Sequence, residues 1–315
     1  MTKNNSTIRS IAFALAIFFV FLPTFSFALV NEEGVDKFRK SVNSILSNTC
    51  LRKNNYGVKI YSLDRGETLY EIRSKQLFIP ASNAKVLTTA VALKYLGSNY
   101  RFSTEFYTDG ILENETLKGN LYIKGSGDPK LVTEQLWLIV NELRNLPIKK
   151  IKGNIIADDS FFDNQKRIKT WIKNPGAQAY EAPLGALSFN FNTVKVYVSP
   201  GEKVGDRPGI VIEPENEYIK LENNAQTLRP GKLRRLIVNR VDKEDHDLIT
   251  VSGGINIGQP RAHYFLNITN PTQYALSVFK SYIDLSGITF DGQLQRGKVP
   301  DDAMELYIHE GEPLA

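Results

Sequence analysis

Residues 86–93 form a stretch that is apolar almost all round when it is wound into a helix. A helix of this kind has no polar face for water, so we expect it to be buried. Pro80 precedes it, where a missing N–H costs no hydrogen bond, and Gly97 ends it. Any fold of this chain must therefore cover this helix.

Other short elements are expected around it. Helical spacing of apolar residues predicts helices over residues 35–51, 131–143 and 274–285, and alternation predicts an antiparallel hairpin over residues 56–72. From residue 98 to about 270 the pattern is that of β-rich insertion material. Strands are expected at residues 104–107, 116–118, 120–123, 151–157, 193–198, 210–213, 218–221, 233–240 and 248–252, with a further short strand at 288–294.

The N-terminal residues 1–28 have the features of a secretory signal peptide. Lys3 and Arg9 form a positive region, residues 11–22 are apolar, and Ser26-Phe27-Ala28 suits a signal peptidase. A retained membrane anchor is the alternative, but the apolar run is short for spanning a bilayer. We therefore expect export across the inner membrane and a periplasmic location.

Composition excludes several classes of function. Cys50 is the single cysteine, so an exported chain has no internal disulfide and must be held together by its cores. The net charge of +5, from 39 basic and 34 acidic residues, is small and interspersed, which argues against nucleic-acid binding. The three histidines have no metal-ligand spacing, and we expect neither a metal nor a cofactor.

A serine and a lysine, Ser82 and Lys85, lie one turn apart at the start of the apolar helix. Positions i and i+3 share a helix face. A serine hydroxyl needs a base to become a nucleophile, and a lysine can be that base if burial or a nearby positive potential lowers its pKa. The alternative is a helix cap at Ser82 beside a solvated Lys85, and the residues alone leave the two interpretations balanced.

The same spacing elsewhere needs a different interpretation. Ser277 and Lys280 repeat it in the middle of an expected helix whose apolar residues form a packing stripe, so we interpret that pair as structural. Residues 125–129 are rich in glycine but lack the Lys-Ser/Thr pair of a phosphate-binding loop, which favours a turn. Ser188-Phe189-Asn190 matches the pattern S-x-N, a second motif of serine penicilloyl enzymes.

The stretch Ile79-Pro80-Ala81-Ser82-Asn83-Ala84-Lys85 resembles the nucleophile motif of class C low-molecular-mass penicillin-binding proteins, the D-alanyl-D-alanine carboxypeptidase/endopeptidases. The resemblance continues in order along nearly all of the chain after the signal peptide. It is carried by residues 86–90, 96–102, 119–129, 151–155, 158–162, 182–183, 187–190 and 270–271.

The resemblance implies an α+β multidomain fold, a serine-β-lactamase-like transpeptidase domain that a large β-rich insertion interrupts. Residues 29–97 would be its first part, residues 98–287 the inserted domains, and residues 288–315 the start of the return to it. In that family pattern Ser188-Phe189-Asn190 falls within the insertion, so we interpret it as structural.

The implied chemistry is acyl transfer on peptidoglycan peptides. Ser82 would attack the penultimate D-Ala carbonyl, Lys85 would take its proton, and water would release the acyl-enzyme. β-Lactams would acylate the same serine, and a peripheral association with the membrane is possible. No cofactor or metal is implied.

One departure from the family pattern concerns the rest of the active site. The family's own S-x-N and K-[ST]-G motifs come later, and this sequence has no K-[ST]-G. Residues 308–315 resemble the segment before that return, so we expect an incomplete transpeptidase domain with little activity and an uncovered apolar helix. The alternatives are a non-catalytic peptidoglycan-binding or vestigial fragment and, disfavoured by the long insertion, a serine β-lactamase or esterase.

Overall fold

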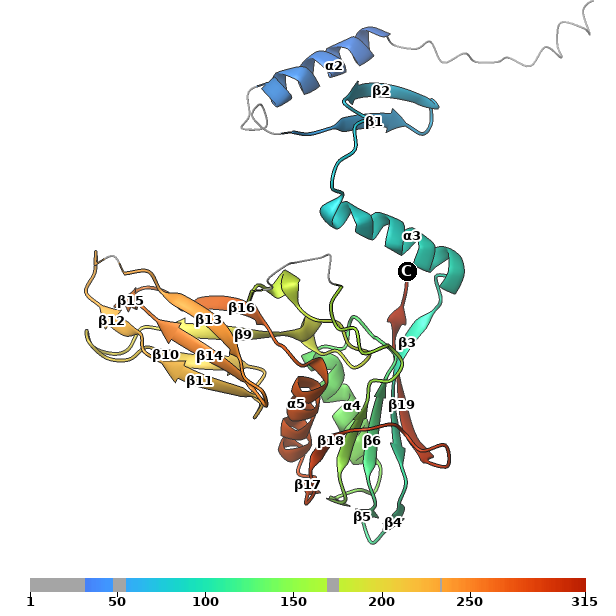
Figure 1. Cartoon of the computed structure of the whole chain (residues 1–315), viewed down its shortest axis with the longest axis vertical. Helices are drawn as coiled ribbons and strands as arrows, with labels where there is room; N and C mark the ends of the chain where they lie inside the picture. Colours follow the sequence, from blue (N-terminus) through green and yellow to red (C-terminus); the bar gives the residue numbers. More distant parts are fainter. Residues whose placement is uncertain (1–31, 48–54, 169–175, 233) are drawn as a thin grey trace, which may run out of the picture. The chain divides into compact units, whose positions relative to one another are not determined.

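The computed structural model describes residues 32–47, 55–168, 176–232 and 234–315 (Figure 1). The signal peptide expected over residues 1–28 lies outside these ranges, as does Cys50. By the density of their internal contacts, residues 1–88 and 89–315 form two compact units. Each unit is described by itself.

The first unit contains a helix and a two-stranded hairpin, both as predicted. Helix α2 (Glu32–Ser47) contacts the hairpin of β1 (Val58–Ser62) and β2 (Glu67–Ile72), whose strands are antiparallel. Tyr70 donates a hydrogen bond of 2.7 Å to the Asn43 side chain and joins the two elements. Among the described residues of this unit, Tyr70 is the one buried apolar side chain.

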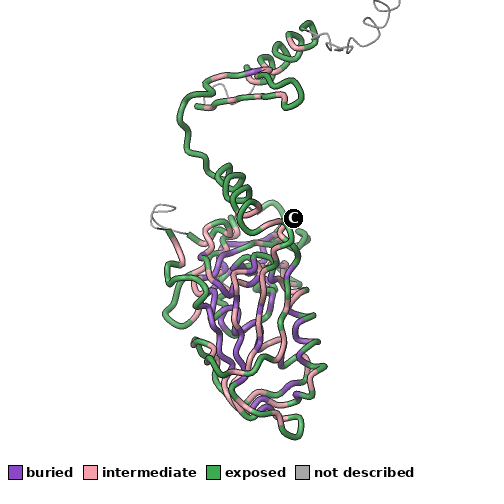
Figure 2. Tube along the Cα trace, turned by 90° about the vertical axis from the view of Figure 1, so that its right-hand side faces the viewer, coloured by how far each residue is buried: buried purple, intermediate pink, exposed green. Residues whose placement is uncertain are grey.

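The apolar helix forms as expected but is not buried. It is α3 (Ala84–Leu96), and it follows a short 3₁₀ turn, η2 (Ala81–Asn83). None of its residues is buried, and Leu87 is 70% exposed (Figure 2). The helix is thus not buried, as its apolar surface alone predicted, but uncovered, as the departure from the family pattern led us to expect. No layer packs over these side chains in the described part of the chain.

Two sheets of the second unit have matching strand orders. One is β18-β8-β6-β3-β19 and the other is β17-β7-β5-β4. Strands β6, β8 and β18 are parallel, and so are β5, β7 and β17. The strand bounds are β3 Arg101–Thr108, β4 Ile111–Glu113, β5 Thr116–Lys118, β6 Leu121–Gly125, β7 Lys150–Lys152, β8 Ile155–Asp158, β17 Thr289–Phe290, β18 Leu294–Arg296 and β19 Met304–Pro313.

A line of glycines marks where the chain passes from one of these sheets to the other. Each of the four passages, β3 to β4, β5 to β6, β7 to β8 and β17 to β18, contains one glycine: Gly110, Gly119, Gly153 and Gly292. A Cβ on Gly153 would collide with the carbonyl oxygen of Gly119, and a Cβ on Gly292 with that of Gly153. The backbones therefore approach here more closely than any other residue allows.

Two helices supply the crossovers between the parallel strands. Helix α4 (Thr133–Asn145) connects β6 with β8, and α5 (Pro271–Leu285) precedes β17 and β18. Their apolar faces join the core of the larger sheet, where the rings of Phe106 and Phe279 stack with centroids 5.6 Å apart. The helical pattern predicted both helices to within a few residues.

Residues 193–267, here called the sandwich lobe, form the remaining strands between α4 and α5. Sheet β10-β9-β16 faces sheet β11-β14-β13, with the pair β12-β15 beside them (Figure 1). Alternate residues of β9 are fully buried, as the period of two predicts. The bounds are β9 Thr193–Ser199, β10 Gly209–Glu213, β11 Ile219–Asn223, β12 Gln226–Leu228, β13 Ile237–Asp242, β14 Asp247–Ser252, β15 Gly254–Asn256 and β16 Ala262–Asn267.

Residues 288–315, expected from the sequence to begin a return to the first domain, supply β17, β18 and β19. These strands pair with β7, β8 and β3 respectively. The architecture is thus a mixed α/β fold with several sheets, in which the C-terminal strands complete the sheets that start at residue 101.

Candidate active site

The two candidate residues lie where the 3₁₀ turn η2 becomes the helix α3. Ser82 is the middle residue of η2, and Lys85 is the second residue of α3. The two residues are therefore three positions apart, close to one helical turn. The Asn83 N–H donates to the Pro80 carbonyl at 2.9 Å and closes the turn. Ser82 and Lys85 are both exposed. The first-turn position is therefore the one that the sequence predicts.

The residue before the serine has an unusual backbone. Ala81 has φ of +44°, in the left-handed region, although it is not a glycine. An alanine there costs about 1–2 kcal/mol relative to the ordinary helical region. Such outliers gather at functional sites, because surrounding structure must hold them in place. The outlier immediately precedes Ser82 at the start of the helix.

The second serine–lysine pair is structural, as interpreted from the sequence. Ser277 is buried in the middle of α5, and its hydroxyl oxygen accepts the N–H groups of Glu217 and Tyr218 at 2.7 and 3.0 Å. Lys280 pairs with Glu217 and Asp284. A hydroxyl that joins α5 to the sandwich lobe in this way is not a nucleophile facing a substrate.

The Ser188-Phe189-Asn190 motif is also structural, which confirms its interpretation. The Ser188 hydroxyl donates to the Gly185 carbonyl at 2.8 Å, and Phe189 is buried. The Asn190 side chain accepts the Thr133 N–H and donates to the Thr133 hydroxyl, both at 3.0 Å. It thereby satisfies a backbone donor at the start of α4, where Val132 as N-cap has no side chain to do so.

The glycine-rich residues 125–129 form a turn, as expected. Gly127 has φ of +87°, and its N–H donates to the Ala186 carbonyl at 2.8 Å. Ser126 exchanges hydrogen bonds with the backbone of Ser103. Because these backbone donors are used within the fold, the segment does not cradle a phosphate group.

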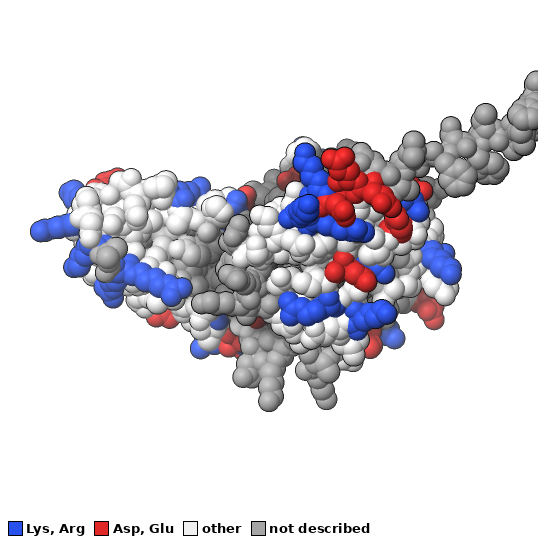
Figure 3. All heavy atoms as spheres, turned by 90° about the horizontal axis from the view of Figure 1, so that it is seen from above, with Lys and Arg blue, Asp and Glu red and all other residues white. Residues whose placement is uncertain are grey.

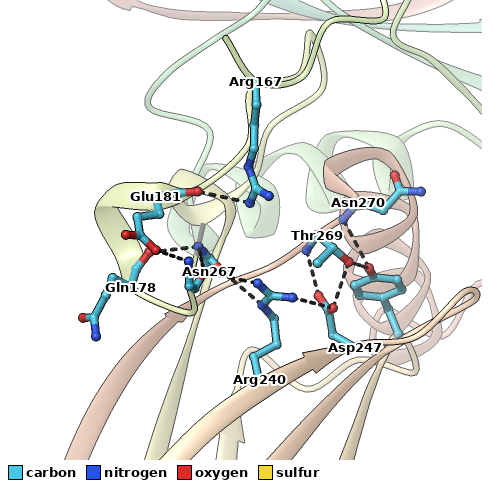
Figure 4. A network of polar contacts seen from close by, with 10 residues as sticks. Arg167, Gln178, Glu181, Arg240, Asp247, Asn267, Thr269 and Asn270 are labelled. Carbon is cyan, nitrogen blue, oxygen red and sulfur yellow. Dashed lines mark hydrogen bonds and ion pairs between the residues drawn. The ribbon is translucent and has the colours of Figure 1, made fainter. Parts of the chain in front are cut away.

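A buried polar network in the sandwich lobe was missed from the sequence (Figure 4). Asp247 accepts two hydrogen bonds of 2.8 Å from Thr269. It also forms an ion pair of 3.5 Å with Arg240, whose side chain is 6% exposed. Arg240 and Asn267 also bind the loop before η3 (Ala179–Glu181) through the Gly176 carbonyl.

The charges of this network are compensated within the fold. Burial raises the pKa of Asp247, against Thr269 and Arg240, which lower it. The polar residues of the network are scattered in sequence between positions 176 and 270, so no local pattern could have shown it. The network joins two strands of the lobe to a loop, and its buried carboxylate, Asp247, is paired with Arg240.

Metal-binding clusters and membrane-spanning helices are both absent from the ranges that the structure describes. Within those ranges, no group of three His, Cys, Asp or Glu side chains could hold a metal ion. None of the helices described there is long and apolar enough to cross a membrane.

The fold is similar to that of a known penicillin-binding protein. The crystal structure of penicillin binding protein 4 from Haemophilus influenzae matches with a TM-score of 0.69 at 23% identity, over 82% of this chain and 57% of that one. The same protein complexed with a β-lactam matches with a TM-score of 0.63 at 22% identity, over 82% of this chain and 56% of that one.

Residues 38–315 match the model of the D-Ala-D-Ala carboxypeptidase 3 (S13) family, and the chain belongs to that family. A D-alanyl-D-alanine carboxypeptidase from Actinomadura sp. (strain R39) is 26% identical over 289 residues, 89% of this chain and 53% of the relative. The carboxypeptidase DacB from Haemophilus influenzae is 23% identical, over 83% of this chain and 54% of the relative. The chain thus spans about half the length of these curated relatives.

Proposed function

We propose that this protein is a serine-type D-Ala-D-Ala carboxypeptidase/endopeptidase that acts on peptidoglycan peptides through an acyl-enzyme. The observation that carries the proposal is the position of Ser82 and Lys85 in the first turn of α3, directly after the left-handed Ala81, in a chain of this family. The β-rich insertion and the periplasmic location expected from the sequence belong to the same proposal.

The proposed chemistry divides between three groups at the helix start. The Ser82 hydroxyl oxygen attacks the carbonyl carbon of the penultimate D-Ala, and the Lys85 amine takes the hydroxyl proton. That proton then passes to the leaving amine of the terminal D-Ala. The Ser82 backbone N–H is suited to stabilise the developing oxyanion, because the start of a helix carries partial positive charge. Water then releases the acyl group.

Penicillin labelling tests the assignment of the two residues. In a chain completed by segments that carry the family's S-x-N and K-[ST]-G motifs, we expect fluorescent penicillin to label the peptide that contains Ser82, and Lys85→Ala to slow acylation by about a hundredfold or more, because general-base catalysis typically contributes that much. Lys94→Ala, in the last turn of the same helix, is the matched control and should leave the rate unchanged. Recovery of labelled protein from periplasmic extract tests the location.

Three outcomes would contradict this assignment. Label on Ser188 or Ser277 would move the nucleophile, and a wild-type rate in Lys85→Ala would remove Lys85 from the chemistry. Peptidoglycan binding without any labelling would support the second candidate, a non-catalytic peptidoglycan-binding protein. The exposure of Ser82 and Lys85 favours that candidate, because a site that performs acyl transfer ordinarily excludes bulk water.

A further inference from the structure

The sandwich lobe has an open hollow of about 580 Å³ at the end where β13 begins. Four exposed cations line it: Lys232, Arg234, Arg235 and Arg261. Its other lining groups include the side-chain amides of Asn256 and Gln259 and the ring of Tyr264, and no carboxylate is among the described residues of the lining. A hollow with this lining suits a ligand that carries negative charge.

The cations of the hollow are not neutralised by the protein itself. Among the residues that the structure describes, none of the four forms an ion pair, whereas Arg240 of the same lobe is paired with Asp247. From residue 225 to residue 241 the sequence has five basic and no acidic residues, and the acidic residues follow at the opposite end of β13. The hairpin of β13 and β14 therefore separates positive from negative charge along its length.

The Arg261 side chain and the turn that contains Asn256 and Gln259 are held in place at the hollow. The guanidinium of Arg261 lies 3.6 Å from the centre of the Tyr197 ring, a stacked position that restricts the orientation of its fork. Lys195 lies 4.5 Å from the same ring. At the turn below, the Asn256 N–H donates to the Gln259 side chain at 3.0 Å and fixes the two amide residues relative to each other.

This arrangement matches one class of ligand better than others. A planar guanidinium binds a carboxylate through two parallel hydrogen bonds. The hollow is open to solvent, as suits a segment of an extended polymer rather than an enclosed small molecule. On the face drawn in Figure 3, the lobe at the left has several basic and few acidic side chains, so a polyanion meets little repulsion.

We propose that the hollow at Lys232, Arg234, Arg235 and Arg261 binds the carboxylate-bearing polymer peptidoglycan, separately from the site at Ser82. The choice of this polymer among anionic ones rests on the proposed function, since that polymer would be the substrate. Binding at the hollow would hold the protein on the wall polymer and raise the local concentration of peptide stems at Ser82. This role needs no acyl transfer.

The test is co-sedimentation of the purified chain with purified peptidoglycan at about 0.1 M salt. In one variant the four cations of the hollow are replaced by glutamine, and we expect at least tenfold weaker binding. The matched control removes four positive charges from the same lobe outside the hollow and should bind within twofold of wild type. Its substitutions are Lys203→Gln, Arg207→Gln, Lys220→Gln and Lys243→Gln, all at exposed side chains.

Other probes separate peptidoglycan from other ligands. A neutral N-acetylglucosamine polymer should bind the wild type and the hollow variant equally weakly. Equal binding of peptidoglycan by wild type and hollow variant would overturn the site, and so would equal loss of binding in the control variant. Tighter binding to anionic lipid vesicles or to duplex DNA than to peptidoglycan, lost in the hollow variant, would overturn the choice of polymer.

The same measurement distinguishes this inference from the proposed function. Ser82→Ala removes acylation but should leave sedimentation with peptidoglycan unchanged. The hollow variant, conversely, should keep its rate of acylation by penicillin, which is too small to use the hollow. If penicillin does not label the protein but the protein still sediments with peptidoglycan, the proposed enzymatic function is overturned and the proposed binding site at the hollow stands.

Discussion

At the scale of single residues, the two serine–lysine pairs have the same spacing but different surroundings. Ser277 is held by two backbone N–H groups inside α5, as a mid-helix packing stripe predicts. Ser82 lies on the first turn of α3, as Pro80 and the following apolar run predict. The roles of Ser82 and Lys85 in chemistry stay a prediction. The left-handed Ala81 had no signal in the sequence, because backbone strain is set by the surrounding structure.

His309 gives a prediction at the same scale. Burial lowers its pKa, and the charge of Asp128 opposes that shift. Its Nε2 atom is buried and has no hydrogen-bond partner among the described residues. Below about pH 6.5 the unfolded chain therefore binds a proton at this histidine that the folded chain does not bind. The folded state loses stability relative to the unfolded state as the pH falls from about 6.5 through the lowered pKa.

We expect thermal unfolding to show this dependence. Between pH 7.5 and pH 5 the melting temperature of His309→Gln should fall less steeply than that of the wild type. His263→Gln is the matched control, since His263 is an exposed histidine of the sandwich lobe, and it should follow the wild type. Parallel curves for the wild type and His309→Gln would show that the pKa of this imidazole does not differ between the folded and the unfolded chain.

At the scale of elements, alternation and helical spacing predicted most strands and helices but not which strands share a sheet. Residues 151–157 were expected to form one strand and instead form β7 and β8 in different sheets, with Gly153 between them. The same break at Gly292 separates β17 from β18. Strands of two or three residues, such as β4, are too short for a period to be read.

The glycine line gives the prediction at this scale. In Gly153→Ala the new methyl group would meet the Gly119 carbonyl oxygen, and backbone cannot move aside as a flexible side chain can. We expect a loss of about 2 kcal/mol or more in the free energy of unfolding, measured by urea titration. Gly209→Ala is the control, because open space surrounds that position, and it should change stability by less than about 0.5 kcal/mol. Equal effects would show that the close approach is not required.

At the scale of the whole molecule, the buried apolar residues are divided unequally between the two units. The core that joins the larger sheet, α4, α5 and the sandwich lobe lies entirely in residues 89–315. In the described part of residues 1–88 only Tyr70 is buried among the apolar side chains. The sequence predicted the helices of both units and most of their strands, though not β16 or β19. The extent of burial depends on long-range packing that no local pattern contains.

This inequality predicts different local stabilities within one chain. Backbone amides exchange with solvent through local opening, and the opening costs least where few apolar contacts are lost. We therefore expect the amides of α2, β1, β2 and α3 to exchange at least a hundredfold faster than those of β6, β8 and α5, measured by hydrogen–deuterium exchange with mass spectrometry. Strand β14 is the internal reference, because alternate residues along it are buried in the part of the same core that the sandwich lobe supplies. Protection of α3 as strong as that of α5 would contradict this prediction. It would show that the apolar side chains of α3, Leu87 among them, are covered in solution.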